Sequence, residues 1–200
     1  KDPALKGRPA VVAPLNSDSA KIWDASPEAK ALGITKGMEL VIAKRIDRSL
    51  KIAPPNPDLY QSVHKKLLHQ ASRMTPLFED AGAGKIYLDF TGFDKLYGSP
   101  DAFARKIKDT ISYSFNLRPR LGVAANKLVA KAATNPYQVE EDVFSVIEKK
   151  AESFLEPFPN RALPVVKDLQ KSSLDIFEDL NLVSVRDLKS LDLMTLQAFF

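Results

Sequence analysis

Apolar residues follow two different spacings along this chain, and together they predict a mixed α+β fold. Short apolar runs of strand composition occur at residues 10–13, 50–52, 85–90 and 118–124. Longer stretches place apolar residues on one helical face, from Asp58 to about Met74 and from Pro100 to Phe115. Ile22 and Trp23 are expected to be the hairpin partner of the first run.

Capping residues mark where the shorter helices begin and end. Ser26-Pro27-Glu28 combines a capping hydroxyl, a proline in the first turn and a carboxylate near the positive end of the helix dipole. Gly33 is expected to end this helix after one or two turns. Further short helices are predicted over residues 39–45 and 126–131.

The character of the chain changes after about Lys150, where strand-like runs disappear. Residues 154–159 indicate a hinge that leads into short helices near 168–180, 184–191 and 193–200. Ser184 fits a helix cap, and Asp187 completes a capping box with it. The pattern therefore predicts an α+β domain that carries a small insertion and is followed by a small all-helical domain.

Composition adds a few exclusions. The chain is ordinary globular material, with 44% hydrophobic and 27% charged residues and a net charge of +4. It contains no cysteine, which excludes disulfides, thiolate metal sites and thiol nucleophiles and suits a reducing compartment. No apolar run approaches the ~20 residues that span a bilayer, so no membrane partner is expected. The start at Lys1, without a leader, indicates a domain boundary with sequence missing upstream.

Four ordered segments carry a family resemblance. They read D-P-A-L-K-G-R-P at 2–9, A-S-P-E-A-K-A-L-G-I-T-K-G-M at 25–38, E-D-A-G-A-G-K-I-Y-L-D-F-T-G at 79–92 and L-G-V-A-A-N-K-L-V-A-K-A-A at 121–133. In this order and spacing they resemble the core of Y-family (DinB/UmuC-like) translesion DNA polymerases. The family patterns are D-P-x-L-[RK]-G-[RK]-P, A-S-Y-E-A-R-x-x-G-I-x-x-G-M, S-x-D-E-A-Y-L-D-x-T-G and G-[IV]-A-x-N-K-x-x-A-K-x-A.

The resemblance implies a polymerase palm with a small fingers insertion, followed by a small all-helical thumb. Residues 1–15 and 75–150 would form the palm, 16–74 the fingers and 151–200 the thumb. The thumb is expected to be helix-hairpin-helix-like with its glycines lost, because residues 163–167 offer none for a close backbone approach to phosphate. The family's further C-terminal domain is expected to be absent from this chain.

The resemblance also locates the positions where a polymerase needs its metal ligands. Nucleotidyl transfer uses two divalent cations held by clustered carboxylates, and Mg²⁺ demands oxygen ligands. The family's Asp-Glu pair falls on Gly84 and Lys85, a residue without a side chain and an ammonium. No catalytic residue, no metal site and no cofactor are therefore expected. The family's third ligand would lie upstream of Lys1.

Displaced carboxylates leave one alternative open. Asp89 would lie about 13 Å along the strand from position 85, at ~3.3 Å per residue. Glu79 and Asp80 precede an Ala-Gly-Ala-Gly loop and are less easily excluded. If these residues served as ligands, Mg²⁺ would be bound and the protein would be an active translesion polymerase.

Three lysines are the candidate phosphate contacts. The family places a Tyr and an Arg on the incoming triphosphate, and this chain has Pro27 and Lys30 at these positions. Lys30 keeps the positive charge of the Arg but loses its bidentate hydrogen bonding to phosphate. Lys131 matches the family's phosphate-contacting lysine, and Lys127 lies one turn before it. The competing interpretation of Lys127 and Lys131 is a solvated helix face.

Other candidates favour ordinary structural roles. His64 and His69 are five residues apart on a helix and are interpreted as solvent-exposed. Trp23 is interpreted as a packing residue. Residues 196–200 resemble a sliding-clamp peptide, but such aromatics more often fill a helical core.

A Y-family frame without these carboxylates and hairpin glycines looks most like the ImuB-like pseudo-polymerases. That resemblance implies a non-catalytic accessory factor in DNA repair and SOS mutagenesis, binding primer-template DNA and, as partners, the sliding clamp and an error-prone polymerase. The localisation it implies is the bacterial cytoplasm, associated with the nucleoid. The rival hypotheses are an active polymerase and a protein-interaction scaffold without DNA affinity.

Overall fold

The computed structural model describes residues 5–93, 96, 98–135, 141–163, 166, 171–192, 194, 195 and 197. The chain divides into two compact units, Lys1–Lys66 and Leu67–Phe200. This division runs within helix α3 (Pro57–Ser72). The finer division into palm, fingers and thumb stays a prediction.

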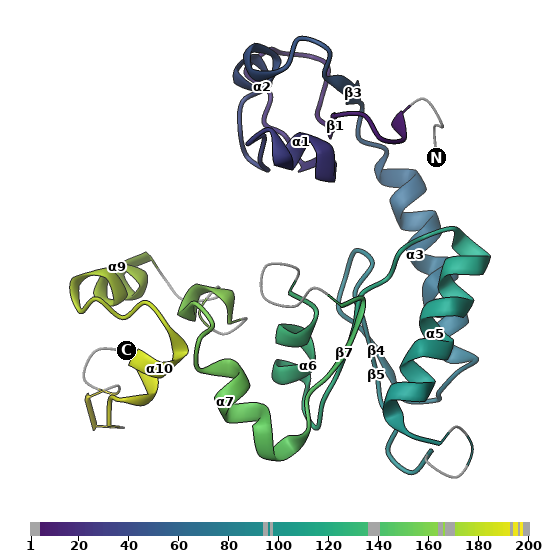
Figure 1. Ribbon diagram of the computed structural model, residues 1–200, viewed down its shortest axis with the longest axis vertical. Coiled ribbons are helices and arrows are strands. Elements are labelled where there is room, and N and C mark those ends of the chain that lie inside the picture. The colour runs from purple at the N-terminus through teal and green to yellow at the C-terminus, as the bar shows by residue number, and fades with distance from the viewer. Residues whose placement is uncertain are drawn as a thin grey trace. The chain divides into compact units, whose positions relative to one another are not determined.

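The first unit is built on a three-stranded sheet in the order β2-β1-β3 (Figure 1). The strand β1 (Ala10–Val12) runs antiparallel to β2 (Asp24–Ala25) and parallel to β3 (Lys51–Ala53). The predicted hairpin partner begins too early: Trp23 N donates to the Val12 carbonyl at 2.8 Å, but the strand β2 itself comprises Asp24 and Ala25. Ile22 is instead fully buried, and its backbone N–H donates to Met38, so it serves the core.

Two short helices complete the first unit. In α1 (Pro27–Ala31) the Ser26 hydroxyl accepts a hydrogen bond from Ala29 N at 3.2 Å, which confirms the predicted cap. The second helix, α2, spans Leu40–Ile46. The strands and helices share one apolar core of nine buried residues: Val11, Ala13, Ile22, Ala25, Ala29, Ile34, Leu40, Ala43 and Leu50.

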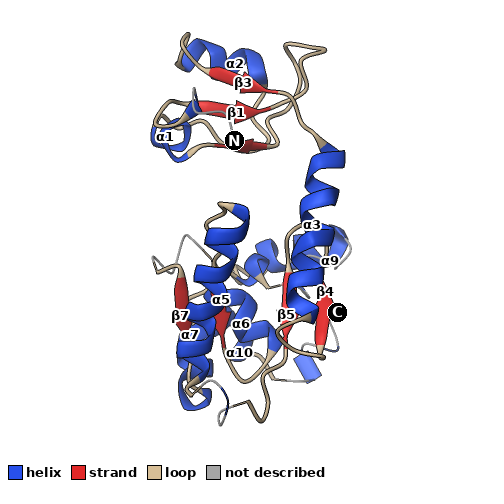
Figure 2. Cartoon of the chain, turned by 90° about the vertical axis from the view of Figure 1, so that its right-hand side faces the viewer, coloured by secondary structure: helices blue, strands red, loops and turns tan. Residues whose placement is uncertain are grey.

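The second unit contains two separate two-stranded sheets (Figure 2). An antiparallel hairpin joins β4 (Phe78–Asp80) to β5 (Ile86–Leu88), and β6 (Leu121–Val123) runs parallel to β7 (Val143–Ser145). The sequence did not predict β4 or β7. Both have only three residues. In addition, β4 is exposed and contains two acidic residues, so it lacks the apolar signature of a strand.

Two helices pack against the parallel pair. The helix α5 (Pro100–Phe115) contacts β6 and β7, and it has the predicted bounds, with Ser99 as its N-cap. The ring of Phe103 meets Phe90 edge-to-face at 4.2 Å between centroids, and this contact ties α5 to the end of the β4–β5 hairpin. The helix α6 (Lys127–Ala133), capped by Asn126, also packs on β6.

The C-terminal part is helical, as predicted. It contains the 3-10 turns Glu148–Lys150 and Asn160–Ala162 and the helices α7 (Ala151–Leu155), α9 (Lys171–Asp179) and α10 (Val185–Lys189). The predicted hinge at 154–159 begins too early, because α7 continues to Leu155. The predicted helix at 193–200 falls mostly outside the described residues.

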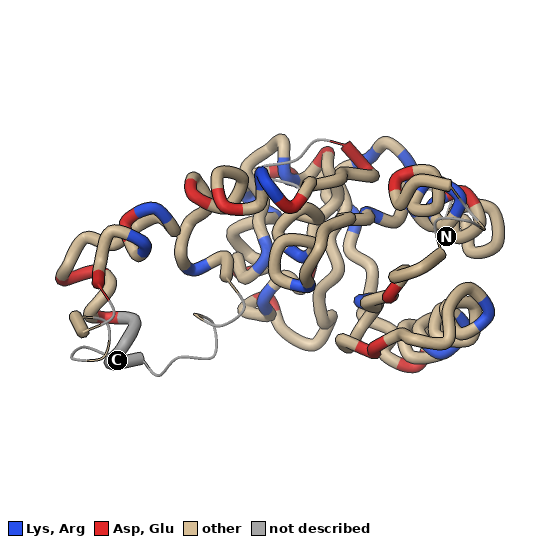
Figure 3. The backbone as a smooth tube through the Cα atoms, turned by 90° about the horizontal axis from the view of Figure 1, so that it is seen from below, with Lys and Arg blue, Asp and Glu red and all other residues tan. Residues whose placement is uncertain are grey.

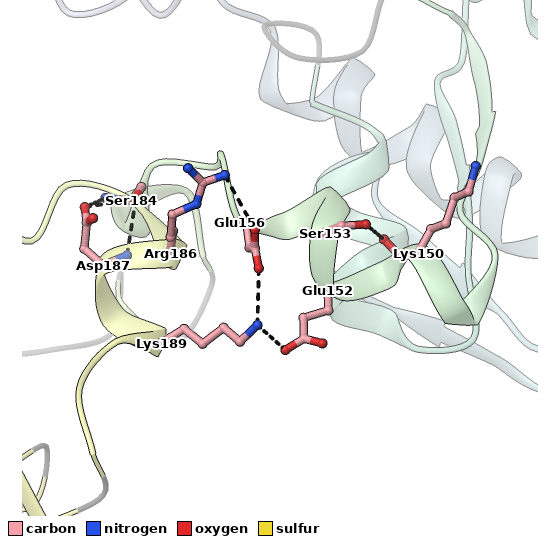
Figure 4. A network of polar contacts seen from close by, with 8 residues as sticks. All are labelled: Lys150, Glu152, Ser153, Glu156, Ser184, Arg186, Asp187 and Lys189. Carbon is pink, nitrogen blue, oxygen red and sulfur yellow. Dashed lines mark hydrogen bonds and ion pairs between the residues drawn. The ribbon is translucent and has the colours of Figure 1, made fainter.

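Polar contacts hold α10 against the end of α7 (Figure 4). Ser184 and Asp187 form the predicted capping box. The Lys189 ammonium lies 2.5 Å from a Glu152 oxygen and 3.2 Å from a Glu156 oxygen, and Arg186 lies 3.5 Å from Glu156. Hydrogen bonds to Glu152 and then Glu156 raise the pKa of Lys189.

No helix in the described ranges is both long and apolar enough to cross a membrane.

Gly122 sets the distance between β6 and α6. A Cβ atom at this position would lie 2.0 Å from the carbonyl oxygen of Ala130 and 2.8 Å from the Cβ of Ala133. Both obstacles belong to α6, and one is backbone, so the helix would have to move away from the strand. The close packing of this strand and helix therefore requires glycine.

We expect Gly122→Ala to lower the free energy of unfolding by about 3 kcal/mol, since overpacking against backbone cannot be relieved by a rotamer change. Urea unfolding followed by circular dichroism measures this as a lower midpoint. An unchanged midpoint with an unchanged slope would show that α6 has room to shift.

Candidate functional site

The two positions expected to replace the metal ligands lie at the turn of the β4–β5 hairpin. Lys85 N donates to the Gly82 carbonyl at 2.8 Å, and Ala81 N donates to the Lys85 carbonyl at 3.0 Å. Gly82 and Gly84 have φ angles of +80° and +76°, in the left-handed region. Because non-glycine residues are strained there, the backbone of this turn itself favours glycine at position 84.

Three carboxylates lie close to this turn in sequence. Asp80 accepts a hydrogen bond from Gly82 N at 2.8 Å. Glu79 forms an ion pair with Lys127. Asp89 accepts hydrogen bonds from the hydroxyl and the backbone N–H of Thr91, at 2.7 and 2.9 Å. Each of these carboxylates therefore has a local partner.

The hydrogen bonds from Thr91 hold the pKa of Asp89 below its ordinary value, with the side-chain bond the larger cause. Within the part of the chain that the structure describes, no group of three or more His, Cys, Asp or Glu side chains is arranged to hold a metal ion. At the two positions that the family fills with Asp and Glu, Gly84 and Lys85 provide no side-chain oxygen for a cation. That Gly84 and Lys85 mark a lost catalytic site stays a prediction.

The two lysines of α6 have different surroundings. The Lys127 side chain is 63% exposed, pairs with Glu79 and lies 5.7 Å from the centre of the Tyr87 ring, within cation–π distance. Lys131 follows one turn later and is half-buried. The structure therefore places both lysines on α6 as expected, and it directs Lys127 toward the hairpin.

Lys30 lies in the other unit, near the end of α1. Its ammonium is 3.5 Å from a carboxylate oxygen of Asp24, and its side chain is 48% exposed. Pro27 is the first residue of the same helix. Lys30 and the two lysines of α6 therefore belong to different units of the chain.

Sequence reasoning missed Glu79 and Tyr87 as the partners of Lys127. These two residues face each other across the hairpin, because the register of β4 and β5 pairs Glu79 with Tyr87. Recognising Phe78–Asp80 as a strand would have revealed this pair. The missing signal was apolar alternation, which an exposed strand does not need.

The remaining candidates add little to the site. Residues 164, 165 and 167 of the expected thumb turn lie outside the described part, as do most of residues 196–200. Trp23, interpreted as a packing residue, is 48% exposed. Lys and Arg alternate with Asp and Glu along the backbone rather than forming one block (Figure 3).

The comparisons decide the family. A model described as "IMS: impB/mucB/samB family" matches residues 1–135. The chain belongs to this family. The DNA polymerase IV of Xanthomonas campestris pv. campestris strain 8004 is 30% identical over 199 residues, covering 100% of this chain and 54% of the relative. That of Desulfatibacillum aliphaticivorans is 28% identical over 199 residues, covering 100% and 49%.

Solved structures agree with the fold. DinB from Sulfolobus solfataricus superimposes with a TM-score of 0.78 at 23% identity, over 99% of this chain and 57% of that chain. An insertion ternary complex of Dbh DNA polymerase gives 0.81 at 23% identity, over 99% and 58%. The expected Y-family polymerase core and its α+β fold are confirmed. The chain spans about half of the length of these relatives.

We expect Thr91→Val to return the pKa of Asp89 toward its ordinary value by removing the hydroxyl donor. Stabilisation from a lowered carboxyl pKa is complete above the unfolded-state pKa of about 3.9 and is lost as the pH falls through the folded-state pKa. The stability gap between parent and variant should therefore shrink upon acidification below about pH 4. Carboxyl NMR titration measures the pKa.

Thr110→Val is the matched control, because the Thr110 hydroxyl donates to the Lys106 carbonyl and touches no carboxylate. This variant should leave the Asp89 titration unchanged. Equal titration curves in the parent and in Thr91→Val would contradict the assigned cause.

Proposed function

We propose that this chain is the core of a non-catalytic, ImuB-like Y-family protein that acts in DNA repair and induced mutagenesis. The supporting observation is the β4–β5 turn, where glycine and lysine stand at the positions that the family fills with Asp and Glu. A lysine ammonium repels the cations that nucleotidyl transfer needs.

The proposed ligand is primer-template DNA, held through its phosphates without sequence readout. Lys127 and Lys131 lie four residues apart on α6, so they share one helix face. The polymerase structures that this chain resembles include an insertion ternary complex, which supports a nucleic-acid partner for the shared fold. In our proposal Lys127 exchanges Glu79 for a phosphate oxygen when DNA binds.

The proposed protein partners are the sliding clamp and an error-prone polymerase. They follow from the ImuB-like assignment. Association with the bacterial nucleoid in the cytoplasm belongs to the same proposal.

An active translesion polymerase is the second candidate. Its support comes from the relatives, which are named DNA polymerase IV, and from Glu79 and Asp80 on the strand opposite β5. In that case these displaced carboxylates would contribute to a Mg²⁺ site. The two candidates differ in one measurable property, which is the incorporation of nucleotides.

Primer extension by the full-length protein that carries this chain separates the candidates. We expect no incorporation above background with Mg²⁺ or Mn²⁺ and all four nucleotides, because Gly84 and Lys85 supply no ligand oxygen from their side chains. An active relative serves as the positive control. Incorporation that disappears in an Asp80→Asn variant would establish the active polymerase instead.

DNA binding is tested by fluorescence anisotropy on a labelled primer-template between low and moderate salt. We expect the slope of log affinity against log salt to fall in magnitude by about 1.8 in Lys127→Gln/Lys131→Gln, since each lost phosphate contact removes about 0.9. Glu79→Gln should strengthen DNA binding, because it removes the carboxylate that pairs with Lys127.

The matched control replaces two exposed lysines of α3, Lys65→Gln/Lys66→Gln, and should keep the parent slope. No binding by the full-length parent at low salt would favour the scaffold without DNA affinity. Binding with equal slopes in parent and α6 variant would remove Lys127 and Lys131 from the interface.

A further inference from the structure

The first unit contains a basic hollow to which none of the candidate phosphate contacts belongs. It has a volume of about 430 Å³ and is lined by Arg8, Pro9, Arg48, Ser49, Leu50 and Lys51. The three cationic residues of this lining are exposed, whereas Leu50 is buried and forms part of its floor. We call this feature the β1–β3 hollow.

Parallel strand pairing creates the hollow. The strands β1 and β3 lie side by side, with Ala10 opposite Lys51 (Figure 2). Lys51 N donates to the Pro9 carbonyl at 3.0 Å, which fixes the two chain segments against each other. Because parallel strands begin at the same edge of a sheet, Arg8 before β1 and Arg48 before β3 arrive at one place.

The positive charges of the hollow are not compensated locally. Among the described residues, Arg8, Arg48 and Lys51 form no ion pair. The neighbouring carboxylate of Asp47 accepts hydrogen bonds from the Ser49 backbone N–H and hydroxyl, at 2.8 and 2.7 Å. Other cations of this unit differ, since Lys30 pairs with Asp24 and Lys44 with Asp18.

We propose that the β1–β3 hollow binds the phosphate backbone of a nucleic-acid strand, separately from Lys30, Lys127 and Lys131. Two guanidinium groups favour phosphate, because each can present two parallel N–H donors to phosphate oxygens. Exposed cations around an open hollow suit a chain that passes over the surface. This inference rests on the proposed DNA binding and adds a second contact region to it.

The test compares two charge-matched variants of the full-length protein in the same anisotropy titration. Arg48→Gln/Lys51→Gln removes two charges from the hollow. Lys21→Gln/Lys36→Gln removes two exposed charges near the opposite end of β1, where Gly37 N bonds to the Ile22 carbonyl and Trp23 N to Val12. Matching thermal unfolding curves establish that all of the proteins are folded.

We expect the hollow variant to bind at least about tenfold more weakly at low salt, with a salt slope smaller in magnitude by about 1.8, while the control keeps the parent values. Arg8→Gln alone should reduce the slope by about 0.9. This single variant keeps the test decisive if the double variant unfolds early.

The outcomes separate this inference from the proposed function. If the parent binds DNA and the hollow variants behave like the control, the hollow is not a contact region and the proposed function stands. If the parent does not bind, both fail. If inorganic phosphate displaces DNA from the parent more readily than from the hollow variant at equal ionic strength, DNA and phosphate compete for the hollow, which supports the backbone assignment.

Discussion

The turn between β4 and β5 is the constraint on which the interpretation of this protein depends. Its two hydrogen bonds close the hairpin, and this closure places Gly82 and Gly84 at positive φ. A residue with a side chain at position 84 would cost roughly 1–2 kcal/mol in backbone strain. The same register sets Glu79 opposite Tyr87, so the exposed strand β4 brings a carboxylate to Lys127. Backbone geometry thus determines which charges lie at this place.

Much of the fold followed from the sequence because its signals were local. The Ser26 cap, the helical spacing from Asp58 and from Pro100, and the Ser184–Asp187 capping box all lie where the structure has them. Each depends on residues within one turn, so short-range chemistry decides it. The strands were harder, since β4 and β7 have three residues each and gain their stability from partners distant in sequence.

The site was only partly accessible to the same reasoning. The resemblance located Gly84, Lys85, Lys127 and Lys131, but it could not show that Glu79 neutralises Lys127, since 48 residues separate the two. The placement of Ile22 in a strand was wrong for a similar reason. Ile22 is buried against Met38 and the core, and this packing outweighs its propensity for a strand. The β1–β3 hollow does not correspond to any single linear motif, because its cations come from two segments about 40 residues apart in sequence. It exists because parallel pairing brings two separate basic segments together.

The shared ion pairs between α7 and α10 have a consequence for shortened versions of this chain. Glu152 and Glu156 stand one helical turn apart, and like charges at that spacing destabilise an isolated helix by roughly 0.2–0.5 kcal/mol. Lys189 lies between them and turns this repulsion into attraction. A truncation that ends before α10 would leave two adjacent anions without their counter-ion. Such a truncation should therefore weaken α7 by roughly 0.2–0.5 kcal/mol.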